Sequence, residues 1–315
     1  MTSIIIGTRG SPLAIAQSTQ ICDQILHYHP DLNITLKTIS TYGDELQSLP
    51  DAAQPTSFEK GWFTGALENA LLEKQVDMVV HSLKDLPTAS THDTLIVAAI
   101  PKRVFAEDLL ISKMPTTSFN PLLDLPEHST IGTGSPRRRS QILAIRPDLC
   151  VRPIRGNVGT RIQKLIQDPS LDAIILARAG LARLSFSVPK EIFVAPIPLH
   201  VLLPAPGQGA LAIQTRQDDK LIQDLLLPIH DPRTAQAVTA ERAFLQALGG
   251  GCLAPVAAFA EYQTHAASIQ AFFEPAGFAP RKYGLSAPPD TSPVTLAQRL
   301  AKLFEQSSAS YVPRS

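Results

Sequence analysis

Short apolar runs alternate along the chain with longer segments of helical periodicity, and this alternation predicts an α/β fold. Residues 4–6 are three isoleucines that read as a buried strand, and Ser11-Pro12 then begins a helix that ends at His29-Pro30. Serine is a favoured helix cap, and proline suits the first helical position. The same patterns predict helices over 63–74, 158–167, 234–248 and 296–304, and strands over 76–80, 130–133, 150–154, 171–176, 211–214, 256–260 and 268–273.

The pattern occurs twice, which predicts two similar lobes. A glycine turn stands between a strand and a Ser-Pro-capped helix at residues 7–12 and again at 132–136. Residues 203–210 are rich in proline and glycine and suit a return of the chain into the first sheet. Residues 43–57 read as a loop, and no element is assigned within 274–292. We expect a first lobe of residues 1–100 with 202–227, a second lobe of 101–201 and a small third domain of 228–315.

Composition is that of an ordinary globular protein, with 44% hydrophobic and 18% charged residues among 315. No apolar run approaches the roughly 20 residues that span a bilayer, so no membrane association is expected. The first residues, Met1-Thr2-Ser3-Ile4, lack the basic segment that begins a secretory signal. Three cysteines argue against a disulfide framework. A cytoplasmic location is therefore expected.

Positive charge is concentrated in one window although the net charge of the chain is zero. Residues 131–183 hold nine of the seventeen arginines and one lysine against three aspartates, a net charge of +7. Arg9, Arg137, Arg138 and Arg155 stand at predicted strand-to-helix turns, where side chains and backbone N–H groups meet anions. Guanidinium groups match carboxylates bidentately. We expect a cleft that binds several carboxylates or phosphates; Arg139, Arg146 and Arg152 read as solvated surface charges.

Two further residues are candidates for chemistry. Asp85 follows a predicted strand beside Lys84, where it could act on a polar ligand or simply pair with the lysine. Cys252 follows three glycines, which can expose a thiol as a nucleophile or covalent tether, although an incidental loop cysteine fits equally well. Cys22 and Cys150 lie in predicted elements and are expected in the core.

Nucleotide and metal chemistry have no positive support in the sequence. Gly132 and Gly134 lack the third glycine of a dinucleotide fingerprint, and no phosphate-binding P-loop motif occurs. The histidines are scattered, and His27 and His29 stand two apart on a helix, hence on different faces. No metal site is expected.

Seven motifs, in order, resemble those of the porphobilinogen deaminase family. The resemblance covers the chain as far as Phe259 and fades beyond it. Each motif is weak alone, but seven in the family's order are very specific. They are residues 7–14 (GTRGSPLA), 60–63 (KGWF), 81–87 (HSLKDLP), 132–138 (GTGSPRR), 155–161 (RGNVGTR), 203–210 (LPAPGQGA) and 250–252 (GGC).

The resemblance implies two lobes like those of periplasmic binding proteins, with a cleft between them, and a small α+β third domain carrying Cys252. It implies a dipyrromethane cofactor attached to Cys252 by a thioether. Four porphobilinogen molecules are then added, each losing ammonia, and water releases hydroxymethylbilane. Asp85 matches the family's catalytic aspartate, which stabilises the azafulvenium cation. Positions matching carboxylate-binding residues are Arg9, Ser11, Lys84, Arg137, Arg138, Arg155, Arg161 and Arg183; Phe63 matches an aromatic beside the substrate, and Lys60 the end of a mobile loop.

Two other classes of function remain as alternatives. A two-lobed binding protein for polycarboxylates would use the same cleft without turnover and would give Cys252 no task. A nucleic-acid binder would use the basic window, but that window has no interleaved aromatic residues. Porphobilinogen is thus the expected small-molecule partner, nucleic acid is not expected, and the resemblance suggests a monomer.

Overall fold

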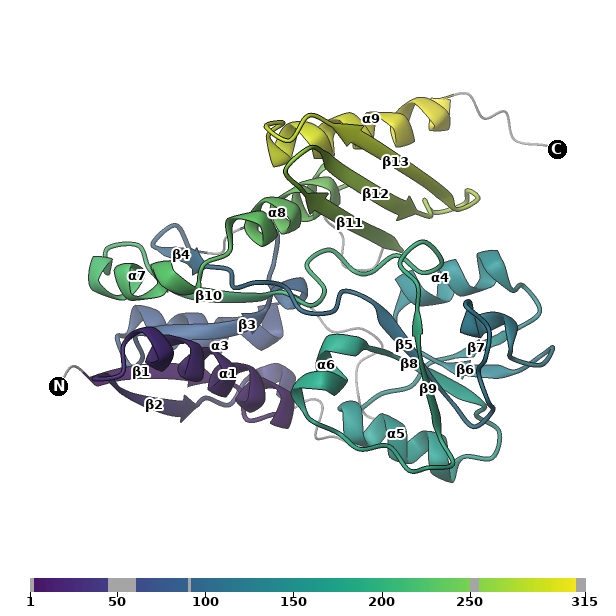
Figure 1. Cartoon of the computed structure of the whole chain (residues 1–315), viewed down its shortest axis with the longest axis horizontal. Helices are drawn as coiled ribbons and strands as arrows, with labels where there is room; N and C mark the ends of the chain where they lie inside the picture. The colour runs from purple at the N-terminus through teal and green to yellow at the C-terminus, as the bar shows by residue number, and fades with distance from the viewer. Residues whose placement is uncertain (1–2, 45–60, 90–91, 250–254, 310–315) are drawn as a thin grey trace. The chain divides into compact units, whose positions relative to one another are not determined.

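The structure is a computed structural model that describes residues 3–44, 61–89, 92–249 and 255–309. The chain divides into two compact units (Figure 1). One comprises Met1–Val104, Ala179–Phe186 and Gly209–Ala235, and the other comprises Phe105–Arg178, Ser187–Gln208 and Gln236–Ser315.

The first unit is built on a five-stranded mixed sheet. Its strands are β1 (Ser3–Thr8), β2 (Asn33–Thr38), β3 (Met78–Ser82), β4 (Leu95–Ala99) and β10 (Leu211–Arg216). They are ordered β2-β1-β3-β10-β4; β1 is parallel to β2 and β3, whereas β10 is antiparallel to β3 and β4. The late strand β10 therefore returns to the first sheet, as the Pro/Gly-rich segment before it predicts.

Helices cover both faces of this sheet. Successive side chains of β1 point to opposite faces, and apolar side chains on each face pack against a helix. Ile4 and Ile6 pack with Ile21 and Ile25 of one helix, whereas Ile5 packs in the cluster of a second helix. The oxygen of Ser11 accepts a hydrogen bond from the Ala14 N–H and caps the first helix. The helices of this unit are α1 (Pro12–Tyr28), α3 (Gly61–Leu72) and α7 (Lys220–Leu226), with 3₁₀ turns η2 (Leu83–Asp85) and η4 (Leu227–Ile229).

The second unit contains a sheet with the same pattern of directions. Its strands are β5 (Asp108–Ser112), β6 (Thr130–Gly132), β7 (Cys150–Arg152), β8 (Ala173–Ala177) and β9 (Phe193–Ile197). They are ordered β7-β6-β8-β5-β9, with β6 parallel to β7 and β8, and β5 antiparallel to β8 and β9. The accompanying elements are η3 (Pro121–Leu123), α4 (Pro136–Ile145), α5 (Val158–Gln167) and α6 (Arg178–Arg183), whose last residues belong to the first unit.

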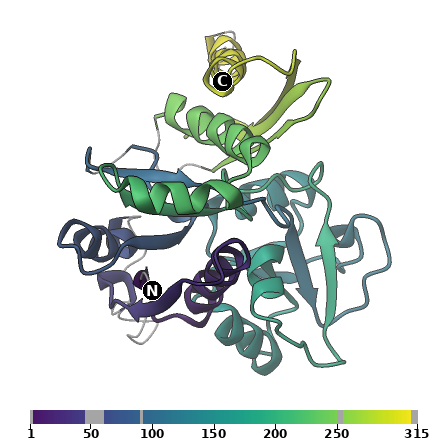
Figure 2. The same cartoon turned by 60° about the vertical axis from the view of Figure 1, so that its left-hand side comes forward.

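A three-stranded antiparallel sheet lies in the C-terminal part of the second unit. It consists of β11 (Val256–Tyr262), β12 (Ala267–Phe273) and β13 (Arg281–Ala287), and its helices are α8 (Pro232–Ala247) and α9 (Pro293–Ala309). Alternate β11 residues such as Ala258 and Ala260 share one core with Phe244 of α8 and Phe304 of α9. Both helices therefore pack on the same face of this sheet. The backbone of this sheet and its two helices can be followed by colour in Figure 2.

The predicted α/β class, with two sheet-and-helix lobes and a small third domain, is confirmed. The exact domain boundaries stay a prediction. One expectation is wrong: Cys150 is exposed, because it lies on β7 at the edge of its sheet. Cys22 is partly buried and packs against the hydrophobic core between the first sheet and α1. Residues 45–57 of the predicted loop lie outside the described residues.

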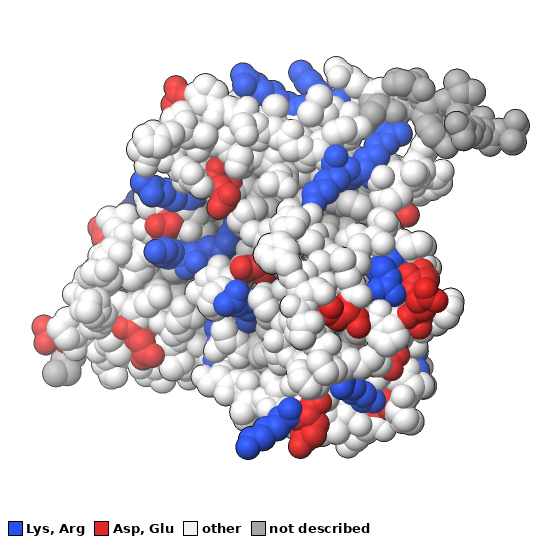
Figure 3. Space-filling model, turned by 45° about the vertical axis from the view of Figure 1, so that its right-hand side comes forward, with Lys and Arg blue, Asp and Glu red and all other residues white. Residues whose placement is uncertain are grey.

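Charges of both signs are interspersed on the face shown in Figure 3, without a broad patch of one sign. None of the helices within the described ranges has the length and apolarity needed to cross a bilayer.

Candidate functional site

Arg9 and Phe63 meet in the first unit. Arg9 follows β1, and its guanidinium carbon lies 4.3 Å from the centre of the Phe63 ring. Its Nε donates to both oxygens of Asp44 at 3.1 and 3.2 Å, and its Nη2 also pairs with Asp44. Burial raises the pKa of Asp44, but hydrogen bonds from Arg9 and Thr41 outweigh burial and leave the pKa below its ordinary value. Arg9 is thus held by an aromatic face and an ionised carboxylate.

Lys84 and Asp85 occupy the 3₁₀ turn that follows β3 directly. The turn is anchored because Leu83 is buried and its N–H donates to the Ala210 carbonyl at 3.1 Å. Ser82, the last residue of β3, accepts a hydrogen bond from Gln17 of α1 at 2.8 Å. Asp85 itself is exposed. A buried strand and a helix therefore present an exposed carboxylate on a short, anchored turn.

Arg183 ends α6 and is fixed within the first unit. Its Nε donates to Gln20 of α1 at 3.1 Å, and its Nη2 donates to the Gly209 carbonyl at 2.9 Å. Burial lowers the pKa of Arg183 to about 10. Neither partner carries a charge, so an anionic ligand would be stabilised here.

Arg137 and Arg138, at the start of α4, converge on one buried aspartate. Both side chains are at most 7% exposed, and Asp108 of β5 is fully buried. Asp108 accepts from Arg137 at 2.8 Å, from Arg138 at 2.7 Å and from Gln208 at 2.9 Å. The second terminal nitrogens of the two arginines donate to the backbone carbonyls of Leu203 and Ile175.

This cluster is ionised. Burial raises the pKa of Asp108, but the two guanidinium groups more than compensate and hold that pKa well below its usual range. Burial also lowers the pKa of Arg137, although Asp108 opposes that shift. Two cations share one anion, so the cluster retains a net positive charge.

Arg155 and Arg161 flank the turn that begins α5. Asn157 caps the helix by accepting from the Thr160 N–H at 2.9 Å. Gly156 has a φ of +106°, and a Cβ at that position would lie 2.7 Å from the Thr160 side chain, so glycine is required. The Gly156 carbonyl accepts from Arg161 Nε at 2.7 Å. Burial, followed by the charge of Arg138, lowers the pKa of Arg161 to about 10.

The cations fit a polyanionic cofactor such as dipyrromethane, with its several carboxylates. Arg161 and Arg183 are substantially buried, and no carboxylate contributes to either pKa shift. Burying an uncompensated cation is costly, and a bound carboxylate would relieve that cost. The donor set of each unit therefore suits an acidic ligand.

The predicted site residues divide between the two units. Arg9, Ser11, Phe63, Lys84, Asp85 and Arg183 lie in the first, and Arg137, Arg138, Arg155 and Arg161 in the second. Lys60 and Cys252 lie outside the described residues. Arg139, Arg146 and Arg152 are not part of these clusters: they contact the Val151 carbonyl, Asp148 and Asp168, respectively. The expectation of a solvated surface charge is wrong for Arg146, whose side chain is 15% exposed and donates to the carbonyls of Leu122 and Leu125.

Sequence reasoning missed the partners of these arginines. Asp44, Asp108, Gln208 and Gln20 were not singled out. Asp108 carried a signal, because an aspartate in the apolar run Asp-Leu-Leu-Ile-Ser must find a cation when that strand is buried.

Two family models match the chain. The porphobilinogen deaminase dipyromethane cofactor-binding domain matches residues 4–224, and the porphobilinogen deaminase C-terminal domain matches residues 235–279.

Curated relatives named porphobilinogen deaminase match most of the chain. The protein of Deinococcus deserti is 46% identical over 263 residues, which is 82% of this chain and 81% of the relative. The protein of Listeria monocytogenes serovar 1/2a is 43% identical and covers 82% of this chain and 80% of its own. That of Thermus thermophilus is 42% identical, with 84% and 82% covered.

One solved structure with a weak resemblance to the chain is that of a periplasmic binding protein. A periplasmic sulfonate-binding protein, SsuA from Methylobacillus flagellatus, is 9% identical, with a TM-score of 0.40 over 77% of this chain and 67% of that chain.

Proposed function

The chain belongs to the porphobilinogen deaminase family, and we propose that Asp85 and the arginines of both units serve the reaction of that family on a cofactor held by Cys252. That reaction joins four porphobilinogen molecules head to tail on a dipyrromethane primer and releases the linear tetrapyrrole hydroxymethylbilane. The observation that carries the proposal is 42–46% identity to relatives of this name over more than four fifths of the chain.

The cofactor supplies a pyrrole carbon that is a nucleophile and keeps the product tethered until release. Cys252 would hold it through a thioether. Thiolates form such bonds readily because sulfur is a strong nucleophile. Three glycines precede Cys252 in the sequence, and glycine permits backbone conformations that can expose a thiol.

The arginines bind and orient the carboxylates. Arg9, Lys84 and Arg183 would serve from the first unit, with Ser11 able to donate its hydroxyl hydrogen while its oxygen caps α1. The second unit supplies Arg155, Arg161 and the net charge of Arg137 and Arg138 beside Asp108. Phe63 orients Arg9 by stacking, and Lys60 would assist from the preceding segment.

Asp85 would accept a hydrogen bond from the substrate's pyrrole N–H. The carboxylate then stabilises the positive charge that develops as ammonia leaves. The anchored turn at the end of β3 supports this role because it fixes the carboxylate before substrate arrives.

Porphobilinogen is the proposed small-molecule partner, and we propose that the enzyme acts as a monomer in the cytoplasm. We propose no role for nucleic acid in this function.

Intact-protein mass spectrometry of the purified protein tests the function. The wild-type chain should weigh more than its sequence by two pyrrole units, and denatured protein should turn red with Ehrlich's reagent. C252S is the matched control and should show the bare mass because it has no thiol for attachment.

A bare wild-type mass from cells with a working haem pathway would support the rival polycarboxylate-binding protein. Normal cofactor loading of C252S would instead require a different attachment residue.

A further inference from the structure

A row of buried hydrogen bonds crosses the face of the first sheet that α3 covers. Nε2 of His81, on β3, lies 3.0 Å from Oε1 of Gln214, on the neighbouring strand β10. Nε2 of Gln214 donates in turn to Oε1 of Glu68, on α3, at 3.1 Å. All three residues are buried, with no more than 5% of their surface exposed. We refer to them as the His81 relay.

The carboxylate of Glu68 fixes the direction of every hydrogen bond in the relay. An ionised carboxylate can only accept, so the Gln214 amide turns its NH2 group to Glu68 and its oxygen to His81. That amide oxygen also only accepts, so Nε2 of His81 carries a hydrogen. A neutral His81 is therefore held as one tautomer, with no hydrogen on Nδ1.

The relay lies in a largely apolar layer. His81 shares a face of the sheet with Val79, which packs with Leu67 and Leu71 of α3 in a hydrophobic cluster. A buried polar group in such a layer is costly unless it is hydrogen-bonded. A satisfied polar network, by contrast, specifies one arrangement of the elements that carry it. The relay therefore helps to set how α3, β3 and β10 pack together.

These three elements carry or anchor residues of the candidate site. Strand β3 leads directly into the turn that presents Asp85, four residues after His81. Ala210, which directly precedes β10, accepts a backbone hydrogen bond from the same turn. Helix α3 carries Phe63, whose ring contacts the guanidinium of Arg9. A change in the relay would thus be transmitted to the turn that holds the carboxylate.

The charge state of His81 is coupled to its surroundings. Burial has the largest influence and leaves the pKa of His81 below its ordinary value. The hydrogen bond to Gln214 and the charges of Glu68 on α3 and Asp85 after β3 raise that pKa, without outweighing burial. The charge of Arg9, after β1, lowers it. His81 is thus a neutral imidazole near neutral pH, in the electrostatic field of Asp85.

A proton on His81 would oppose the proposed chemistry. The reaction develops positive charge beside Asp85, and that carboxylate stabilises it. A buried imidazolium nearby would attract the carboxylate's charge and repel the developing cation, and the low dielectric of the interior strengthens both effects. The neutral form of His81 leaves the charge of Asp85 available to the substrate.

We propose that His81 is a positioning residue for Asp85, held by Gln214 and Glu68 as one neutral tautomer, and that turnover requires this form. The imidazole acts through the turn that follows β3 and through its own lack of charge. This inference rests on the proposed function, which places the developing cation beside Asp85.

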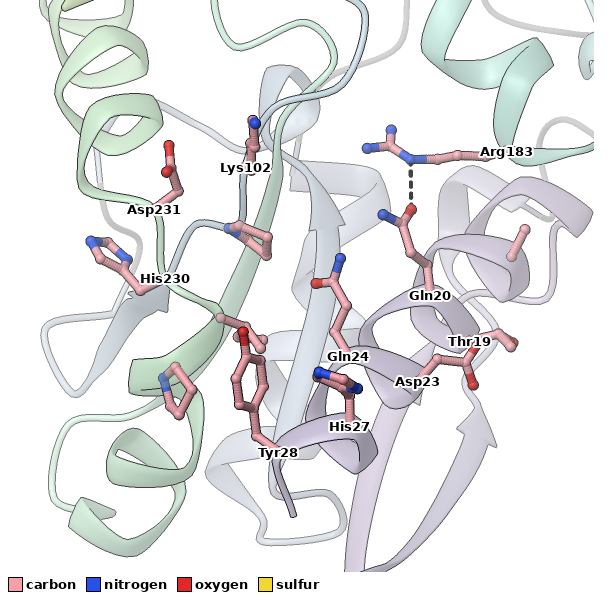
Figure 4. A pocket seen from close by; sticks show the side chains of 14 residues that line it. Thr19, Gln20, Asp23, Gln24, His27, Tyr28, Lys102, Arg183, His230 and Asp231 are labelled. Atoms are coloured by element: carbon pink, nitrogen blue, oxygen red, sulfur yellow. Dashed lines mark hydrogen bonds between the residues drawn. The ribbon is translucent and has the colours of Figure 1, made fainter. Parts of the chain in front are cut away.

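The relay is separate from the candidate carboxylate-binding contact on the other face of the sheet. Helix α1 covers that face, and its Gln20 accepts from Nε of Arg183 (Figure 4). Substitutions in the relay leave this contact in place. They should therefore change kcat more than KM.

Two substitutions of His81 separate its hydrogen bond from its charge. H81Q keeps a neutral N–H donor for Gln214 but cannot become a cation, and it should retain most of the wild-type kcat at neutral pH. H81L removes the donor and should lower kcat by about 10- to 100-fold, because a small displacement of the turn misplaces Asp85. Steady-state kinetics of cofactor-loaded enzyme measure both effects, and circular dichroism identifies the folded variants.

The pH profile of kcat supplies a readout that packing alone would not move. In wild type, kcat should fall as the pH drops through the pKa of His81, which lies below the ordinary value of about 6.5. In H81Q this loss should be absent, so kcat should persist to lower pH. H27Q is the matched control, because it makes the same substitution at an exposed histidine of α1, and it should keep the wild-type profile.

Nitrogen-15 NMR of the wild-type protein gives a second readout, which does not depend on turnover. The His81 signal, assigned by its loss in H81Q, should show a hydrogen on Nε2 and none on Nδ1 at neutral pH. A hydrogen on Nδ1 alone, or a charged imidazole, would contradict the relay.

Three kinetic results would overturn the positioning role. They are an H81Q kcat that is reduced at least tenfold at neutral pH, an H81L kcat equal to that of wild type, and an H81Q profile that falls at the same pH as that of wild type. If H81L does not fold, the two H81Q results decide. Absence of the cofactor mass and of turnover in wild type would instead overturn the proposed function.

Discussion

The buried arginines of this chain differ in whether a carboxylate compensates their charge. Arg137 and Arg138 are buried around Asp108, so part of their charge is used inside the protein. Arg161 and Arg183 are also largely buried, but their hydrogen-bond partners are neutral. We therefore expect the second pair to gain more from a bound carboxylate.

Replacing Asp85 with alanine should lower kcat by at least about 10²-fold, because the carboxylate that stabilises the developing cation is lost. The fold should persist, since Asp85 is exposed. Steady-state kinetics and circular dichroism of cofactor-loaded protein measure the two effects. Near-normal kcat would remove Asp85 from the mechanism.

Replacing Asp108 with alanine should destabilise the protein by about 3–5 kcal/mol, because two arginines would stay buried without their anion. Denaturant unfolding measures the loss. R152A is the control: it breaks an ion pair whose side chains are 42% and 38% exposed, and it should barely move the midpoint. Equal effects of the two variants would contradict the argument.

The pH dependence of this contribution follows from the lowered pKa of Asp108. Aspartate in the unfolded chain has a pKa of about 3.9. The stabilisation is therefore present above that pH and is lost only as the pH falls through the lower pKa of the folded state.

At the scale of elements, strand-to-helix turns provide the cationic groups. Ser135 caps α4 beside Arg137, and Asn157 caps α5 between Arg155 and Arg161. Caps and glycines are local features, so the sequence predicts these turns well. The return strand β10 is predicted for a similar reason, because a Pro/Gly-rich segment precedes it. The sequence pattern does not predict strand β13, because glycine and proline surround its alternating residues Tyr283, Leu285 and Ala287.

G156A should destabilise the protein by about 1–3 kcal/mol, since alanine is strained at a φ of +106° and its Cβ would meet Thr160. It should also raise KM by displacing Arg155 and Arg161. G65A is the matched control, because a Cβ there meets nothing within 4 Å in the middle of α3. Thermal unfolding should show G65A neutral or stabilised; a neutral G156A would contradict the turn argument.

At the scale of the whole molecule, the chain passes between two sheets of matching strand directions. The chain leaves the first sheet after β4 and enters the second sheet at β5. It returns from β9 of the second sheet to the first sheet at β10. The first sheet contains β10, so it is incomplete until residues after the second sheet have been synthesised. Such long-range pairing slows folding.

The α/β class, the capped turns and the family can be predicted from the amino-acid sequence, because they depend on local patterns and on the order of the motifs. Tertiary structure decided which groups meet. Asp108 pairs with both Arg137 and Arg138 from 29 and 30 residues away, and Gln20 meets Arg183 across 163 residues. Strand order and helix packing bring these groups together, and no local propensity encodes either.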